Sequence, residues 1–233
     1  MKYIIRFRKR GVICYTSHLD IMKVFKRAFK RAGISLKHSE GFNPHPKMGF
    51  AQPLSLGYEA LEEYIEFETA ENFPVPDDIE EGILRPLQDI MPEGLELTGI
   101  CEAPWLKKTL AAETVMAEYR VEIPADTSGI NAEELGEAYM AQGEIITLKK
   151  QKKKPEPVPV DIRPKIQSLR AQSAEGGIIL RMRLDQGSQS NLSPELVITT
   201  FLEFAGIGTD RSEIDVTREK IGFTRDIDKY FQS

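Results

Sequence analysis

The chain has 233 residues, of which 41% are hydrophobic and 29% charged, a composition typical of a folded globular protein with one large or two small domains. Its apolar runs, such as residues 178–180, are far shorter than the roughly 20 residues of a membrane-spanning helix. Charges at Lys2 and Arg6 interrupt any secretory signal, so we expect a cytoplasmic protein without membrane contact. Two cysteines, Cys14 and Cys101, are too few for a disulfide framework or for a zinc or iron–sulfur site.

The charge is distributed unevenly along the chain. The net charge is -5, yet residues 1–50 hold 12 Lys and Arg against only Asp20 and Glu40, and all three histidines lie in the same segment. The remaining residues are acidic overall. A basic region on an acidic protein favours a polyanionic partner, because its field attracts phosphate to one face. The alternative is a solvated basic helix face.

The first half predicts a strand followed by a helix. Alternating apolar residues over 3–7 indicate a strand with one buried face. Ser17 and Asp20 form a capping box at the start of the helix, and Gly33 is placed to end it in a left-handed conformation. The predicted buried stripe consists of Leu19, Met22, Phe25, Phe29 and Ala32. The opposite side carries Lys23, Lys26, Arg27, Lys30 and Arg31.

The order of elements predicts an α+β fold of two tandem ferredoxin-like domains. After the first helix we expect strands at 34–38, 64–68 and 95–100, with a helix at 78–89 before the last of them, which gives the order β-α-β-β-α-β. The same order follows with strands at 118–123, 144–149, 162–169, 177–184 and 214–221 and helices at 132–142 and 195–205, the second opened by Ser193 and Pro194. The predicted domains are 1–105 and 114–233. One larger α+β sheet is the alternative.

A lysine- and proline-rich segment, residues 149–160, interrupts the second half. Prolines at 155, 157 and 159 favour a stiff, extended connection, and Lys149, Lys150, Lys152, Lys153 and Lys154 add positive charge. The segment is interpreted either as a phosphate clamp or as a solubilising loop.

Residues 39–48 contain the strongest functional signal. Asn43 and His45 each precede proline, which forces extended backbone geometry, so Asn43, His45 and Lys47 are predicted to point to one side. An amide, an imidazole and an ammonium group in a row suit contacts to phosphate or to a base. Phe42 offers a ring for stacking on an unpaired base, but we expect it to be a core residue.

His18 lies at the predicted start of the first helix, where backbone amides attract anions. It is interpreted either as part of the cap or as an anion contact. His18 and His45 are also the candidates for general acid–base catalysis. The histidine spacing fits no metal-binding pattern, so we expect no metal site and no cofactor.

Several motifs carry a resemblance to a known family. They are residues 5–9, Tyr15–Asp20, Ser39–Lys47 with its Gly-Phe-Asn-Pro-His-Pro string, 161–164 and 187–194. Together they resemble the radical-SAM-linked protein family, a bacterial domain of unknown function that is associated with a radical SAM enzyme. The chain has no Cys-x-x-x-Cys-x-x-Cys motif, so the resemblance implies a companion of that enzyme. Tandem ferredoxin-like domains are also similar in architecture to CRISPR RNA-processing endonucleases and pseudouridine synthases, which favours RNA.

The leading hypothesis is an RNA-binding companion that presents ribosomal or transfer RNA to a radical SAM enzyme. The predicted binding residues are Arg6, Arg8, His18, Lys23, Arg27, Lys30, Asn43, His45 and Lys47. The alternatives are an RNA-processing enzyme with a histidine acid–base residue and a protein adaptor for a radical SAM enzyme.

Overall fold

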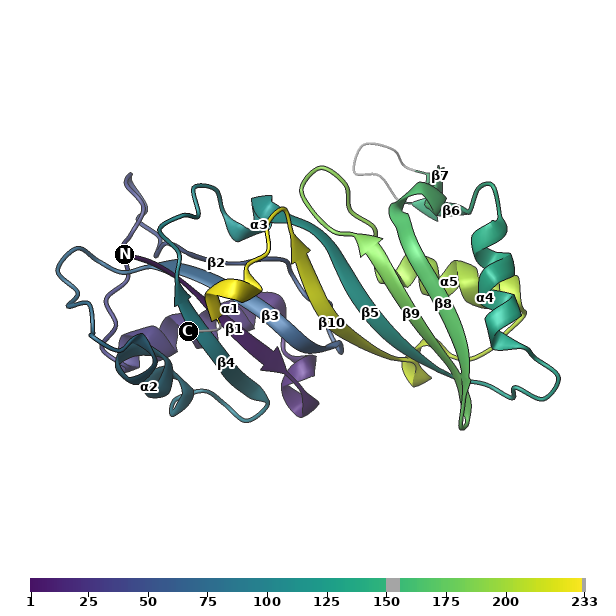
Figure 1. Ribbon diagram of the computed structural model, residues 1–233, viewed down its shortest axis with the longest axis horizontal. Helices are drawn as coiled ribbons and strands as arrows, with labels where there is room; N and C mark the ends of the chain where they lie inside the picture. The colour runs from purple at the N-terminus through teal and green to yellow at the C-terminus, as the bar shows by residue number, and fades with distance from the viewer. Residues whose placement is uncertain (150–155, 232–233) are drawn as a thin grey trace. The chain divides into compact units, whose positions relative to one another are not determined.

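The computed structural model describes residues 1–149 and 156–231, and the chain divides into two compact units (Figure 1). Unit 1 comprises Met1–Val115 together with the residues from Lys220 onward, and unit 2 comprises Met116–Glu219. The sequence-based division assigns the last segment to the second domain. In the structure the chain returns to unit 1, because Ile221 and Phe223 pack with Tyr64. The architecture is mixed α+β, dominated by β-sheet with few helices.

The sheet of unit 1 is built around β1 (Lys2–Lys9). This strand lies between β3 (Glu59–Glu68) and β4 (Leu95–Glu102) and is antiparallel to both, and β2 (Met48–Phe50) pairs with the end of β3. Ile5 lies opposite Ile65 on one side and Ile100 on the other. The predicted alternation is therefore confirmed as a central strand.

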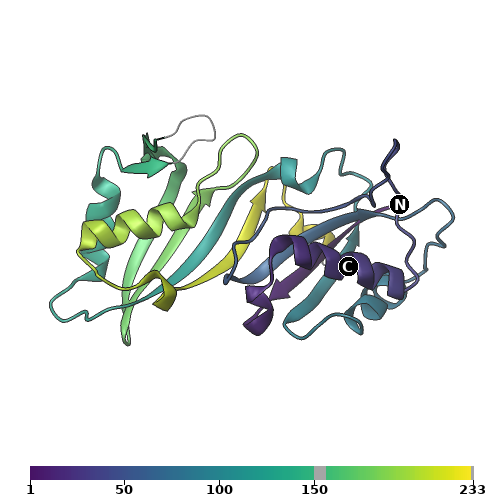
Figure 2. The same ribbon diagram turned by 180° about the vertical axis from the view of Figure 1, so that it is seen from behind.

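One face of this sheet is covered by helices. They are α1 (His18–Arg31), the π-helical turn η2 (Glu80–Leu84) and α2 (Arg85–Gln88). Tyr3, Ile5 and Phe7 of β1 pack there against Phe25 and Phe29 of α1. Figure 2 shows α1 lying across this face.

The boundaries of α1 agree with the predicted signals. The Asp20 amide donates to the Ser17 hydroxyl at 3.2 Å, and Gly33 follows the helix with φ of 72°. The predicted stripe is wrong at Leu19, which is 70% exposed, because it lies in the first turn beyond the edge of the core. Ile21 and Ala28 are buried in addition to Phe25 and Phe29.

The second face of the sheet carries a smaller core. Ile4, Tyr64 and Cys101 pack there with Leu110 of α3 (Leu110–Glu113) and with the C-terminal segment that contains η5 (Asp228–Phe231). The C-terminal segment lies in front of the sheet in Figure 1, on the side away from α1. The unit 1 sheet is therefore covered on both faces.

Two predicted elements of unit 1 differ from the structure. Residues 34–38 form only isolated bridges, Leu36 to Thr69 and His38 to Pro46, and the strand at this edge is β2 instead. The helix predicted over 78–89 is split into η2 and α2. Pro86 has no amide hydrogen to donate to the Gly82 carbonyl, so a regular α-helical turn is interrupted at this point.

Unit 2 has three long antiparallel strands with two helices on one face. The strands are β5 (Thr114–Pro124), β9 (Gly177–Asp185) and β8 (Ile166–Ala174), in that spatial order, followed in the chain by β10 (Asp215–Phe223). The helices are α4 (Ala132–Ala141) and α5 (Pro194–Ala205). Tyr139 of α4 contacts α5 through the Phe201 ring, whose centroid is 5.3 Å away, and through a 2.7 Å hydrogen bond with Thr200.

Besides η5, three short 3₁₀ turns occur among the described residues. They are η1 (Gly11–Tyr15), η3 (Arg163–Lys165) and η4 (Arg211–Glu213).

The lysine- and proline-rich segment is only partly described. β6 (Ile146–Lys149) pairs with β7 (Val158–Asp161) as a separate two-stranded ribbon, so the described part of 149–160 is a strand pair rather than a plain connection. Lys150, Lys152, Lys153 and Lys154 lie outside the described residues.

The two N-cap serines provide a test of the α1 boundary. Ser17 and Ser193 are both exposed, but only Ser17 accepts a side-chain hydrogen bond from its helix. Ser17→Ala should therefore lower the free energy of unfolding by about 1 kcal/mol, and the matched Ser193→Ala by less than about 0.5 kcal/mol. Urea denaturation of both variants measures the difference, and equal losses would contradict the assigned cap.

Candidate nucleic-acid interface

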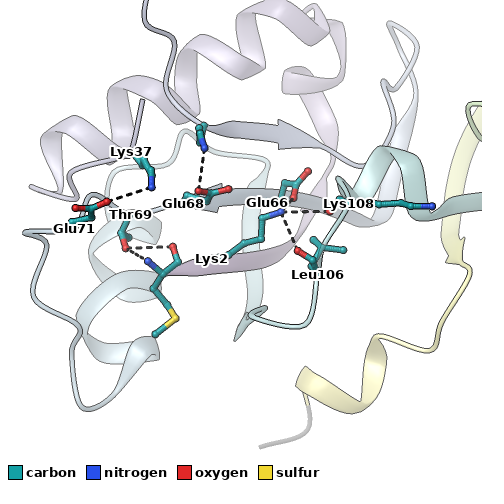
Figure 3. Close-up of polar contacts among 10 residues, drawn as sticks. Lys2, Lys37, Glu66, Glu68, Thr69, Glu71, Leu106 and Lys108 are labelled. Atoms are coloured by element: carbon teal, nitrogen blue, oxygen red, sulfur yellow. Dashed lines mark hydrogen bonds and ion pairs between the residues drawn. The ribbon is translucent and has the colours of Figure 1, made fainter. Parts of the chain in front are cut away.

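The cations of the first fifty residues fall into a paired and an unpaired group. The ion pairs are Lys2–Glu66 at 3.0 Å, Arg8–Glu96 at 3.3 Å, Lys23–Asp20 at 2.8 Å, Lys37–Glu71 at 3.5 Å and Lys47–Glu68 at 3.7 Å. Figure 3 shows the pairs of Lys2 with Glu66 and of Lys37 with Glu71. Within the described ranges, Lys26, Arg27, Lys30 and Arg31 of α1 are exposed and form no ion pair. The available positive charge is thus concentrated on the second half of α1.

Arg6 and Arg8 lie on the other face of the sheet. The Arg6 guanidinium lies over the Phe231 ring at 5.0 Å, and Arg8 pairs with Glu96. They point away from α1 because side chains on a strand alternate between faces, and Tyr3, Ile5 and Phe7 occupy the α1 side. The nine residues predicted to bind nucleic acid therefore do not gather on one surface.

Residues 37–47 fold back on themselves as a hairpin-like loop, which protrudes from unit 1 between α1 and β2 (Figures 1 and 2). The Lys47 amide donates to the Lys37 carbonyl at 2.7 Å and the Ser39 amide to the His45 carbonyl at 2.8 Å. Phe42 at the tip is fully exposed, so the expectation that it belongs to the core is wrong. None of the described elements covers the ring at the tip.

The loop separates the residues that were predicted to act together. His45 and Lys47 line a cavity of 420 Å³ that also contains Lys2, Glu66 and Glu68, so its cations face carboxylates. Asn43 is exposed near the tip and does not line this cavity. The structure thus brings His45 and Lys47 together, whereas Asn43 lies apart.

A groove of 480 Å³ lies on the α1 side of the loop. Its lining consists of Lys26, Phe29, Lys30, Gly33, Ile34, Ser35, Leu36, His38 and Pro46, and no acidic side chain from the described residues lines it. His38 Nδ1 lies 3.1 Å from the Leu36 carbonyl, which makes Nδ1 the donor and leaves Nε2 as the second polar atom of the ring. A basic rim over an apolar floor suits phosphate and base contacts together.

Two lining residues, Lys26 and His38, are absent from the predicted set. A signal for Lys26 exists in the sequence, since it lies one helical turn before Lys30 on the same face. His38 carries no such signal. It reaches the groove through the bridge between His38 and Pro46, a contact between residues on opposite sides of the loop.

His18 occupies a different environment. Its ring packs edge-to-face on Phe50 with centroids 5.0 Å apart, and it lines a cavity of only 20 Å³ with Lys9, Gln52 and Glu63. The three histidines line three different cavities, His18 here, His38 in the groove and His45 across the loop. His18 and His45, the two alternative candidates for an acid–base residue, therefore lie at separate places.

The remaining chemistry-bearing residues are dispersed. Residues 1–149 and 156–231 contain no group of three or more His, Cys, Asp and Glu placed to hold a metal ion. Cys14 and Cys101 are buried thiols, and burial raises the pKa of Cys101 to about 12. No helix among these residues has the length and hydropathy required to span a membrane.

The fold and this surface define a mixed α+β protein with a basic groove. The chain belongs to a family described as an uncharacterized protein conserved in bacteria (DUF2344), which matches residues 2–194. That description names neither an activity nor a radical SAM enzyme. No curated protein matches the chain.

Among solved structures, a chain of a Cbf5–Nop10–Gar1 complex is similar to 96% of this chain with a TM-score of 0.50 and 13% identity. This chain spans 50% of that protein's length, and at this identity the likeness concerns the fold alone. An unknown protein from Galdieria sulphuraria aligns over 93% of this chain and 97% of its own length at 14% identity, with a TM-score of 0.25.

Glu62 provides a test of the electrostatics around Tyr64 and Asp228 in unit 1, because its carboxyl is partly buried there. Burial raises the pKa of Glu62, and the negative charge of Asp228 adds to the shift. The Glu62 carboxyl therefore binds a proton more tightly in the folded chain than in the unfolded chain. As the pH falls from 7 toward the ordinary pKa of a glutamate, this difference raises the free energy of unfolding.

Glu62→Gln should therefore reduce the gain in unfolding free energy between pH 7 and pH 5, as measured by urea denaturation. Glu93→Gln, on the exposed turn before β4, controls for the loss of one negative charge. An unchanged pH dependence in Glu62→Gln would contradict the assigned shift.

Proposed function

We propose that the protein binds RNA through the exposed cations of α1 and the adjoining groove. It would act as a noncatalytic companion that presents a structured RNA to a modifying enzyme. One observation supports this most strongly: Lys26, Arg27, Lys30 and Arg31 form no ion pair among the described residues, and Lys26 and Lys30 line a groove without a described acidic side chain. Phosphate is the ligand that this arrangement favours.

The charge of the rest of the chain supports the same proposal. The protein carries a net charge of -5, so an RNA approaching at random is repelled by most of its surface. A local group of unpaired cations steers a polyanion to one place under these conditions. In unit 2, Arg181, Arg183 and Arg211 are paired with Glu219, Glu118 and Glu195, and among the described residues the exposed Arg170 forms no ion pair.

The identity of the enzyme rests on sequence motifs alone. The Gly-Phe-Asn-Pro-His-Pro string and its companions resemble the radical-SAM-linked proteins, so we propose a radical SAM enzyme as the partner and ribosomal or transfer RNA as the ligand. Any iron–sulfur cluster would belong to that partner, since Cys14 and Cys101 are the only cysteines of the chain.

We also propose that each unit is a ferredoxin-like domain. In unit 1, β1 lies between β4 and β3 with β2 beside β3, and in unit 2 the spatial order is β10-β5-β9-β8. These orders, with two helical segments on one face of each sheet, support the proposal.

RNA binding should depend strongly on salt. Each phosphate neutralised on a single strand contributes about 0.7 to the slope of log affinity against log salt concentration, so four lysine and arginine contacts predict a slope of about -3. Fluorescence anisotropy with labelled total bacterial RNA between 50 and 300 mM salt measures it. Absence of binding at low salt would refute the proposed function.

The location of the interface is tested by two double variants. Lys26→Ala/Lys30→Ala removes two groove cations and should reduce the magnitude of the slope by about 1.4. Lys107→Ala/Lys108→Ala removes two exposed lysines of the same unit outside the groove and should leave the slope nearly unchanged. Equal losses in both double variants would contradict the assignment to the groove.

A further inference from the structure

We infer that the groove beside α1 receives an unpaired base, so that the preferred ligand is single-stranded or looped RNA rather than regular duplex. This inference rests on the proposed function and names the substrate class of the same site. Three features carry it: the size of the groove, its apolar floor and the exposed ring of Phe42.

The size of the groove suits a small part of a nucleic acid. Its volume of 480 Å³ falls in the lower part of the range of about 300–1,000 Å³ that is typical of small-ligand pockets. A single nucleotide belongs to this size class. A duplex keeps its bases stacked inside the helix, so it could contact only the rim of such a hollow.

The floor of the groove is built for a ring rather than for phosphate. Leu36 and Pro46 are half-buried and present apolar surface to the groove, whereas Phe29 and Ile34 are almost fully buried and contribute only small exposed parts. Phosphate gains nothing from these side chains, whereas the face of a base is apolar and loses contact with water when it lies against them. His38 adds a polar atom for a base edge or a ribose hydroxyl.

The rim supplies the complementary charge. Lys26 and Lys30 are four residues apart on α1, a rise of about 6 Å along the helix. Both line the groove, so a strand whose base enters it can keep its phosphates against the two ammonium groups. The arrangement combines a cationic track with a stacking surface, as in proteins that bind single strands.

Phe42 offers a second stacking position. Its ring is fully exposed at the tip of the loop, and His38 at the base of the loop lines the groove. Four residues of chain span at most about 14 Å, so one strand can reach both places. An exposed phenyl ring on a protruding loop contributes nothing to the core, whereas stacking on an unpaired base would use it.

The test compares RNA of the same sequence in two forms. Anisotropy titrations at low salt would use a labelled 12-nucleotide single strand and the same strand annealed to its complement. The single strand should bind at least ten times more tightly than the duplex. Phe42→Ala should weaken binding of the single strand by about 5- to 150-fold and leave that of the duplex unchanged.

Controls separate stacking from general damage. Phe42→Trp should retain single-strand affinity, because the larger ring still stacks. Tyr15→Ala removes another exposed aromatic ring of unit 1, outside the loop, and should have no effect. Ser35→Trp fills the groove from an exposed lining position and should weaken only the single strand.

The outcomes distinguish the two levels of the proposal. Equal affinity for both forms, with Phe42→Ala and Ser35→Trp binding like the wild type, would overturn the inference while leaving RNA binding intact. No salt-sensitive binding of either form would overturn the proposed function itself.

Discussion

The burial of β1 on both faces is the constraint on which the arrangement of unit 1 depends. Tyr3, Ile5 and Phe7 pack under α1, and Ile4 packs with Tyr64 on the opposite face. Because both faces are covered, the cations of the first fifty residues are distributed over the two sides of this sheet. Arg6 and Arg8 of β1 point away from α1 and meet Phe231 and Glu96, whereas the lysines and arginines of α1 are exposed to solvent. The basic segment of the sequence thus becomes two separate surfaces.

Stability alone does not explain the unpaired cations of α1. Lys30 and Arg31 lie in the last turn, where the helix dipole favours positive charge by about 0.3–1 kcal/mol each. An exposed ion pair contributes a similar amount, so leaving them unpaired costs little. Neither effect accounts for a groove that joins Lys26 and Lys30 to His38 with no described acidic residue in its lining. This combination is what distinguishes the α1 surface from the cavity beside His45, where Lys2 and Lys47 face two glutamates.

The sequence predicts those parts of the structure that depend on short-range signals. Ser17, Asp20 and Gly33 define α1 because capping and left-handed termination act within one turn of the helix. The alternation of β1 was sufficient to identify the strand, and it also contained the information that Arg6 and Arg8 lie away from α1. The expectation that Phe42 belongs to the core is wrong because it rests on the usual burial of aromatic residues, whereas the tertiary structure leaves this ring exposed. The Lys26–His38 proximity could not be predicted, since it depends on how the chain reverses after Gly33.

Residues 34–38, which were predicted as a strand, form one wall of the groove beside α1. Residues 34–38 have the composition of a strand. The Lys37 amide donates to the Glu68 carbonyl at the end of β3, and the Ala70 amide donates to the Ser35 carbonyl. The pairing with this edge stops after the single bridge from Leu36 to Thr69, and β2 takes the position beside Phe67 instead. Ile34, Leu36 and His38 are therefore released from a regular ladder and form the wall of the groove opposite α1. Ile34, Leu36 and His38 are alternate residues, so an extended backbone places their side chains on one side, toward the groove. The groove thus depends on the extended path of residues 34–38 beside α1 and on the return of the loop at Pro46.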